Sequence, residues 1–206
     1  FDLDGTVLNT DELIFESFRH TFKQFLPEYT LSEEELLSFL GPPLRESFAR
    51  YLSGHQVDEA VEVYRAYNRE KHNDYVTLYP HETEVLKKLH EEGIKMAIVT
   101  TKYKDAAVYG LKCADLDQYF DVVIGSDEVT HGKPHPEALR VALSHLNATK
   151  GYMIGDNVTD IQAGKNAGIG TIGVTWSLKG TQFLLEEHPD YMMESYDDLY
   201  QYLERM

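Results

Sequence analysis

The sequence predicts an α/β protein in which a parallel sheet is covered by helices on both faces, with a stretch of helices inserted near the start. Two observations support this fold class. From residue 79 onward, short apolar runs alternate with helical segments, as in successive strand-helix-strand units. Between residues 12 and 78, no strand pattern interrupts a series of helical periodicities. With 206 residues, the chain is long enough for one large core and a smaller appended domain.

Residues 1 to 4 are interpreted as the end of a first strand, followed by a turn at Gly5. This interpretation places Asp2 and Asp4 at the carboxyl end of the strand. Because the chain begins at Phe1 rather than at a methionine, we expect the earlier residues of this strand to lie in a preceding piece.

The inserted stretch is expected to be entirely helical. From Leu13 to Leu26, apolar residues recur at spacings of three and four, which is typical of an amphipathic helix. Ser32 and Glu35 form a capping-box pair that opens a second helix, which ends before a Gly-Pro-Pro run. Two further helices are expected near 44–53 and 56–74.

The alternating part of the chain begins with a helix that Gly93 closes, followed by an apolar run that reads as a buried strand. The expected helices cover residues 81–92, 103–114, 135–147, 157–167 and 196–204, and the expected strands cover 94–100, 121–125, 151–155 and 170–174, with a further apolar stretch at 191–193.

The composition excludes some classes of partner. The 35 acidic and 19 basic side chains give a formal charge of -16, which repels nucleic acid and anionic lipid head groups, so we expect neither nucleic acid nor membrane as a partner. The single cysteine, Cys113, cannot form an internal disulfide and favours a cytoplasmic location. An acidic protein that handles a phosphate ester needs local positive charge, from a divalent cation, lysine or backbone amides.

A first acidic pair, Asp2 and Asp4, is separated by one residue. Because successive side chains in a strand point to opposite faces, both carboxylates are expected on one face, where they can reach one small ligand. Carboxylate oxygens suit the small octahedral shell of Mg²⁺. The pair therefore predicts a magnesium site, and the alternative is a solvated acidic turn, since Asp-Gly is common in turns.

A second acidic pair, Asp156 and Asp160, follows the strand at 151–155. The two carboxylates lie on one helical face if the next helix starts at or before Asp156. The alternative is a helix N-cap with a first-turn acid that complements the helix dipole. Both acidic pairs follow strands of one sheet, at the edge where open parallel sheets bind ligands, and this coincidence favours a shared site.

Two further polar residues occupy the same kind of position. Lys133 lies in a loop that two prolines stiffen, which fixes where the lysine points. Thr100 ends an apolar strand and can donate its hydroxyl to a phosphoryl oxygen. The alternatives are a solvated lysine and an ordinary β-branched strand residue.

The order of these residues resembles the four motifs of the haloacid dehalogenase (HAD) superfamily, over the whole chain. The matching positions are Asp2-x-Asp4-Gly5-Thr6, Thr100, Lys133 and Gly155-Asp156-x-x-x-Asp160. The resemblance implies a Rossmann-like, three-layer core made of residues 1–11 and 79–206. It also implies that residues 12–78 form the helical C1 cap of the phosphatase branch.

The resemblance implies catalytic roles as well. Asp2 would be the nucleophile that forms a phospho-aspartate intermediate, and Asp4 would act as general acid and then general base. Thr100 and Lys133 would bind the phosphoryl group. These roles describe a phosphohydrolase that stabilises charge and positions groups in line with the phosphorus atom.

The cofactor implied by the resemblance is Mg²⁺. Asp2 and Asp156 would hold it, with the backbone carbonyl of Asp4 as a further ligand. Asp160 is also a candidate metal residue. The favoured role for Asp160 is indirect: it would orient Lys133 or a metal-bound water rather than bind the ion itself.

Three stretches narrow the substrate class. Residues 67–74, 98–102 and 189–192 resemble the inorganic pyrophosphatases of this superfamily, and the phosphoglycolate phosphatases come next. Pyrophosphate or another small phosphorylated compound is therefore the expected substrate, and a non-catalytic HAD-like binding module is the remaining alternative.

Three more residues are expected to bind the substrate. Thr101 and Lys102 follow Thr100, and Lys102 would add positive charge at the site. Arg45 follows a rigid turn in the cap and would reach a second anionic group; the alternative is a simple helix start. We expect a monomer or a homodimer. The nine histidines are interpreted as scattered through the chain and are not expected to bind a metal.

Overall fold

The computed structural model describes residues 1–205, which form two compact units. The core unit consists of Phe1–Asn9 and the chain from Leu78 onward, and the helical unit is Thr10–Thr77. All strands of the described chain lie in the core unit, and the helical unit contains helices only.

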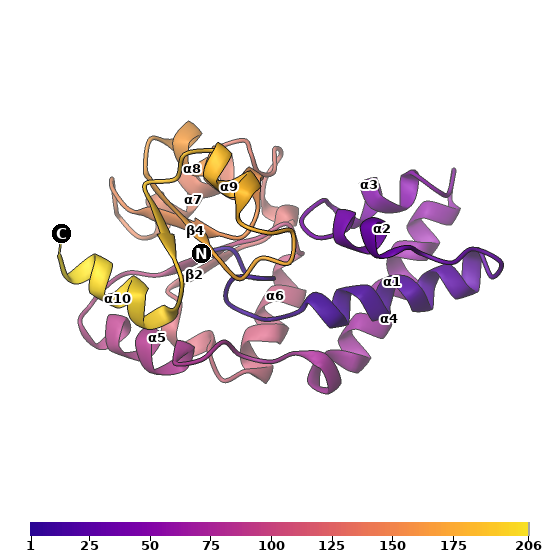
Figure 1. The fold of residues 1–206 in the computed structure, drawn as a ribbon, viewed down its shortest axis with the longest axis horizontal. Helices are drawn as coiled ribbons and strands as arrows, with labels where there is room; N and C mark the ends of the chain where they lie inside the picture. The colour runs from indigo at the N-terminus through magenta and orange to yellow at the C-terminus, as the bar shows by residue number, and fades with distance from the viewer. Residues whose placement is uncertain (206) are drawn as a thin grey trace. The chain divides into compact units, whose positions relative to one another are not determined.

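The strands of the core unit pair in parallel, which confirms the predicted fold class (Figure 1). In one group, β1 (Ala97–Val99) pairs with β2 (Val122–Ile124). In the other, the order is β3 (Tyr152–Gly155), β4 (Gly170–Val174) and β5 (Tyr191–Met193). Short parallel strands of this kind need helical connections, which the alternating sequence supplies.

Phe1 and Asp2 bridge the two groups of strands. The Phe1 carbonyl accepts the Val99 N–H at 2.8 Å, and the Asp2 N–H donates to the Ile154 carbonyl at 2.8 Å. The strand end predicted for residues 1–4 is therefore correct only up to Asp2. After Asp2 the chain turns, since the Leu3 carbonyl accepts the Leu8 N–H at 2.8 Å, and Asp4 lies in this turn rather than in a strand.

Helices cover the sheet on both faces (Figure 1). On one face lie α5 (Glu82–Glu91), α6 (Lys104–Cys113) and α10 (Tyr196–Glu204), and on the other lie α7 (Glu137–His145) and α8 (Val158–Ala167). The α7 and α8 face is closed by buried apolar residues, namely Val99, Ile124, Ala138, Leu139, Ala142, Met153 and Ala163. Such packing of helices on both faces explains why the strands read as continuous apolar runs.

The differences from the predicted elements lie mostly at their ends. The helix expected near 44–53 covers only Leu44–Ala49, and the strand expected over 94–100 covers only Ala97–Val99. α7 begins at Glu137, two residues later than expected, because Pro136 occupies its N-cap position. α8 begins at Val158, with Asn157 as its N-cap. The stretch at 191–193, predicted only as apolar, forms the edge strand β5. Three short segments were not predicted, namely α9 (Gln182–Glu186) and the 3-10 turns Asp117–Tyr119 and Ser126–Glu128.

The helical unit contains the expected succession of amphipathic helices. These are α1 (Asp11–Phe25), α2 (Glu33–Ser38), α3 (Leu44–Ala49) and α4 (Gln56–Tyr75). The predicted capping box is present at the start of α2. The unit has its own core. In this core the Phe18 ring stacks on the ring of Phe39, which follows α2, with 4.0 Å between the ring centroids. This core explains why the stretch folds as a compact unit.

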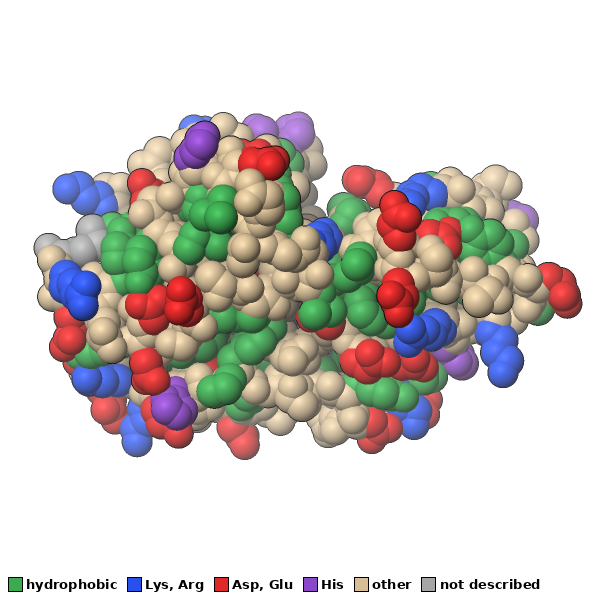
Figure 2. All heavy atoms as spheres, viewed as in Figure 1, with side chains coloured by type: hydrophobic (Ala, Val, Ile, Leu, Met, Phe, Trp, Pro, Cys, Tyr) green, Lys and Arg blue, Asp and Glu red, His purple; other side chains and the backbone are tan. Residues whose placement is uncertain are grey.

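The acidic composition is visible on the surface of the protein. In the view of Figure 2, Asp and Glu side chains are spread over the visible surface, in keeping with the formal charge of -16. No helix within residues 1–205 is both long enough and apolar enough to cross a lipid bilayer.

One buried acid of the core unit is not part of any acidic cluster. Glu82, the first residue of α5, is 1% exposed. Its Oε2 accepts the backbone N–H of Tyr79 at 2.9 Å. Burial raises the pKa of Glu82 to about 8, because this single hydrogen bond offsets only part of the loss of hydration.

Stability should therefore fall with rising pH because of Glu82. The folded protein keeps a proton that the unfolded chain releases above its ordinary pKa of 4.5, so this stabilisation is lost as the pH rises from 4.5 to about 8. Glu82→Gln retains an oxygen for the Tyr79 N–H and removes the titration. Relative to the wild type, we expect the free energy of unfolding of this variant to rise by on the order of 1–3 kcal/mol between pH 5 and pH 8, measured by urea unfolding. The exposed Glu84→Gln in the same helix turn is the control, and identical pH slopes for Glu82→Gln and wild type would contradict the prediction.

Candidate active site

Three carboxylates meet at the carboxyl edge of the sheet. Asp2 lies between β1 and β3, Asp156 follows β3, and Asp160 is the third residue of α8. One carboxylate oxygen from each residue lies within 4.8 Å of one oxygen of each of the other two, and the residues are 6%, 4% and 0% exposed. The structure thus brings together three of the four residues expected at the metal, although Asp2 is far from Asp156 and Asp160 in the sequence.

Lys133 lies against this cluster. Its Nζ is 2.7 Å from Asp2 Oδ1, 2.6 Å from Asp160 Oδ1 and 3.0 Å from the Val99 carbonyl oxygen. The side chain is 4% exposed, and the peptide bond to Pro134 is cis. The prediction that the proline-rich loop fixes the direction of Lys133 agrees with this geometry.

The pKa values of Asp2 and Lys133 are both raised, for different reasons. Burial raises the pKa of Asp2 to about 6, although the Lys133 ammonium opposes the rise. Burial also disfavours the charged form of Lys133, but the Asp160 and Asp2 carboxylates outweigh it and hold the pKa of the ammonium above its usual range. Lys133 therefore remains a cation in the folded protein.

Asp160 uses both carboxylate oxygens within the protein. Oδ1 pairs with Lys133, and Oδ2 accepts the backbone N–H of Asn157 at 3.0 Å, which caps α8. The condition for Asp156 and Asp160 to share a helical face is not met, because α8 starts only at Val158. Asp156 reaches the cluster from the strand end instead. Of the alternative considered for the second acidic pair, the first-turn acid is present as Asp160, but the N-cap is Asn157 rather than Asp156. Asp160 also belongs to the carboxylate cluster.

Asp4 lies next to the cluster but has a different partner. Lys102 Nζ is 2.7 Å from Asp4 Oδ1 and 3.0 Å from Asp4 Oδ2. The group of three mutually close carboxylates does not include the Asp4 side chain. The expectation that Asp2 and Asp4 point their side chains at one ion is therefore not supported, because the chain turns after Asp2.

The remaining predicted binding residues fall into two groups. Thr100, 5% exposed, follows β1, and its Oγ1 accepts the Lys102 backbone N–H at 3.1 Å; half-buried Thr101 lies between them. Arg45 lies in α3 of the helical unit, where its exposed guanidinium pairs with Asp58.

The sequence interpretation missed Asn157, which contacts the cluster, and Lys179, which contacts Asn157. Asn157 Nδ2 donates to Asp156 Oδ2 at 3.1 Å, and Lys179 Nζ donates to Asn157 Oδ1 at 2.7 Å. Lys179 lies in the loop after β4, at the sheet edge where the predicted site residues follow their strands. That position is the sequence signal that could have identified it.

The turn after Asp2 is held against Asp156. Gly5 adopts φ +80, and its carbonyl accepts the Trp176 indole N–H at 3.0 Å. The Tyr196 hydroxyl donates to the Thr6 carbonyl at 2.8 Å. A Cβ at Gly5 would lie 2.7 Å from Asp156 Oδ2, so only glycine fits this turn without displacing the carboxylate.

Gly5→Ala should destabilise the protein more than a matched glycine substitution. Gly168 has nearly the same backbone, φ +75, but a Cβ there would meet nothing within 4 Å. Both alanine variants carry the left-handed cost of about 1–2 kcal/mol. Because Gly5→Ala also collides with Asp156, we expect a further loss of roughly 1–3 kcal/mol in the free energy of unfolding, measured by denaturant titration. Equal losses in the two variants would show that the turn can move away from the carboxylate.

The chain is similar to proteins of one known family. The model of the haloacid dehalogenase-like hydrolase family matches residues 1–174. Pyrophosphatase PpaX of Listeria monocytogenes is 46% identical over 201 residues, which is 97% of this chain and 92% of that protein. Pyrophosphatase PpaX of Anoxybacillus flavithermus is 46% identical over 202 residues, 97% of this chain and 93% of that protein.

A solved structure shows the same fold. A haloacid dehalogenase-like hydrolase from Streptococcus pneumoniae superposes with a TM-score of 0.86 at 30% identity, covering 98% of this chain and 96% of the other. These findings confirm the resemblance drawn from the four motifs and its narrowing to the pyrophosphatases. The chain belongs to the haloacid dehalogenase-like hydrolase family.

Proposed function

We propose that this protein hydrolyses inorganic pyrophosphate to two phosphates, through a phospho-aspartate formed on Asp2. The observation that carries the chemistry is the buried Asp2 carboxylate, held by Lys133 within 4.8 Å of Asp156 and Asp160. The substrate is inferred from the two similar proteins that are named pyrophosphatases.

The reaction assigned to Asp2 has two steps. An Asp2 oxygen forms a bond to one phosphorus atom of pyrophosphate while the bridging P–O bond breaks and the first phosphate leaves. Water then attacks the phosphorus of the acyl phosphate, which releases the second phosphate and restores the carboxylate. Asp4 would give a proton to the leaving phosphate and then take one from the attacking water.

The donor set fits a magnesium ion. The three clustered carboxylates offer hard oxygen ligands, and Lys133 alone does not balance their charge. Asp2 and Asp156, with the backbone carbonyl of Asp4, would hold the ion, which would neutralise phosphoryl oxygens when bound. Because both oxygens of Asp160 already have partners, we assign this residue to orienting Lys133.

The cationic and hydroxyl groups at the strand ends suit a phosphoryl group. Lys133 would contact a phosphoryl oxygen beside Asp2, and the Thr100 hydroxyl, with Thr101, would donate to another. Lys102 lies on Asp4 and so places positive charge where the leaving group would receive its proton. This arrangement favours a leaving group that is itself an anion, such as phosphate.

The helical unit would act as a C1 cap. Its all-helical content and separate core agree with this role. The exposed Arg45 of α3 would give up its contact with Asp58 to bind the second anionic group of the substrate. Closure of such a cap would exclude water from the acyl phosphate until hydrolysis.

Asp2→Asn should abolish turnover without unfolding the protein. The substitution removes the nucleophilic oxygen while keeping the side-chain shape, and loss of a covalent nucleophile commonly lowers kcat by about a thousandfold or more. Steady-state phosphate release measures the loss, and circular dichroism with thermal unfolding checks the fold. The exposed Asp117→Asn is the matched control and should retain wild-type kcat. Undiminished turnover in Asp2→Asn would end the proposed mechanism.

A substrate comparison decides the reaction. We expect kcat/KM for pyrophosphate to exceed that for 2-phosphoglycolate by at least about tenfold, or 1.4 kcal/mol of transition-state stabilisation. A much larger kcat/KM for 2-phosphoglycolate would overturn the pyrophosphatase assignment, and no release of phosphate from a panel of phosphorylated compounds would indicate a binding module.

EDTA should stop phosphate release, and added Mg²⁺ should restore it.

A further inference from the structure

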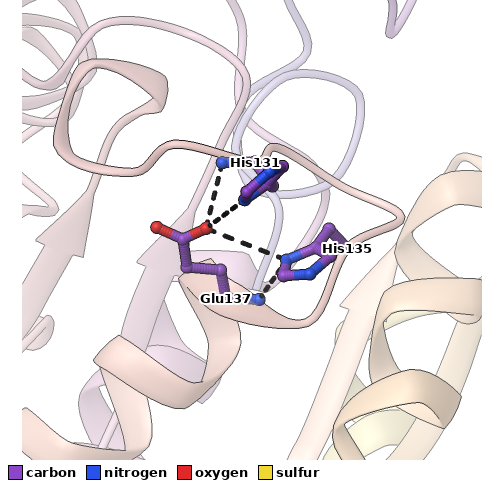
Figure 3. Close-up of side chains that lie close together, drawn as sticks. All are labelled: His131, His135 and Glu137. Atoms are coloured by element: carbon purple, nitrogen blue, oxygen red, sulfur yellow. Dashed lines mark hydrogen bonds and ion pairs between the residues drawn. The ribbon is translucent and has the colours of Figure 1, made fainter.

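A second group of metal-ligating side chains lies outside the carboxylate cluster. His131, His135 and Glu137 face one another at the loop that carries Lys133 (Figure 3). His131 Nδ1 is 2.9 Å from Glu137 Oε2, and His135 Nδ1 is 3.8 Å from the same oxygen. The ligand atoms of all three residues lie within 4.8 Å of one another.

The interpretation of the histidines as scattered is wrong at this place. His131 and His135 are separated by three residues, and Glu137 follows two positions later. The loop turns between them, since the His135 N–H donates to the Gly132 carbonyl at 3.0 Å, and the two imidazole rings come to 4.6 Å between centroids. Neither histidine has a part in the proposed reaction. That reaction therefore does not explain why His131, His135 and Glu137 lie together.

Glu137 is fixed in its place as an anion. Its Oε1 accepts the Thr130 N–H at 2.8 Å, and its Oε2 accepts the His131 N–H at 3.0 Å. The Thr130 N–H lowers the pKa of Glu137 most, followed by the His131 side chain and then the His131 N–H. A carboxylate that is already oriented does not have to lose conformational freedom when a cation arrives.

The donor atoms suit a borderline transition-metal ion. Two imidazole nitrogens and one carboxylate oxygen form a known Zn²⁺ ligand set, with a fourth position open to water. Tetrahedral bonds of about 2.0–2.1 Å place neighbouring ligand atoms about 3.4 Å apart. The observed separations of 2.9 Å and 3.8 Å lie on either side of that value, so small movements of the exposed rings would suffice, together with release of the Glu137 backbone N–H that His135 Nδ1 accepts at 3.2 Å.

We propose that His131, His135 and Glu137 form a second metal site, for Zn²⁺ or a similar borderline divalent ion, on the loop that positions Lys133. The site differs in chemistry from the all-oxygen cluster of Asp2, Asp156 and Asp160, because imidazole nitrogen discriminates against Mg²⁺. The histidine side chains are 62% and 50% exposed, so an ion and its waters can enter from solvent.

The position of the ligands gives the site a physical consequence. His131 lies before Lys133 in the chain, and His135 and Glu137 lie after it. An ion bound to all three would tie the two ends of the loop together while Lys133 Nζ remains on Asp2. Occupancy would therefore restrain the segment that holds this ammonium in the carboxylate cluster.

Titration of the full chain with Zn²⁺ tests the proposal. Excess Mg²⁺ is present throughout, so that the all-oxygen cluster is occupied by the harder ion. We expect calorimetry to show one Zn²⁺ per chain in the wild type and at least about tenfold weaker binding, or 1.4 kcal/mol, in His131→Asn and in His135→Asn. The exposed His145→Asn at the end of α7 is the matched control and should bind as the wild type does.

Co²⁺ in place of Zn²⁺ gives a second readout. Nitrogen coordination should produce a visible absorption band in the wild type that is lost in His135→Asn, while circular dichroism remains unchanged. Equal Zn²⁺ affinity in the wild type and in both histidine variants would overturn the proposal. So would Zn²⁺ binding that disappears in Asp156→Asn and persists in His135→Asn, since the ion would then occupy the carboxylate cluster.

Discussion

The buried contact of Lys133 with Asp2 and Asp160 is the interaction on which the site depends. Charged groups are buried only when they are paired, because removing an ion from water costs several kcal/mol. One ammonium at 2.7 Å and 2.6 Å from two carboxylates meets this condition. Removing the ammonium would leave neighbouring carboxylates in a buried place without compensation. The contact thus ties together the chain start, the loop before α7 and the first turn of α8, and it links the stability of the site to its chemistry.

Backbone geometry places the carboxylates before any ligand arrives. The parallel strands end at one edge, and the hydrogen bond from Asp2 to Ile154 fixes the chain start beside β3. The left-handed turn at Gly5 then comes so close to Asp156 that no side chain fits between them. A site built in this way needs little reorganisation when a phosphoryl group binds, which is the requirement for electrostatic stabilisation of phosphoryl transfer. The backbone packing that fixes the carboxylates in place therefore also prepares them for the proposed chemistry.

The loop around Lys133 joins two kinds of ligand chemistry. Inward, its lysine neutralises carboxylate oxygens that suit a hard ion. Outward, its histidines and Glu137 present nitrogen and oxygen donors to solvent, where a softer ion is favoured. In an acidic protein with a formal charge of -16, both arrangements attract cations, and the identity of the donor atoms is what separates them.

The sequence by itself determined the fold class, the alternation of strands and helices, and the residues of the four motifs, because periodicity and strand-end position are local properties of the chain. The tertiary structure decided which of those residues meet. It placed Asp4 on Lys102 rather than in the carboxylate cluster, because the chain turns after Asp2. It gave Asp160 a capping role, and it brought Lys179 to the site from a loop that carries no motif. Contacts of this kind depend on where a turn or a helix begins, and a shift of one or two residues there moves a side chain by several ångströms, which residue patterns alone do not specify.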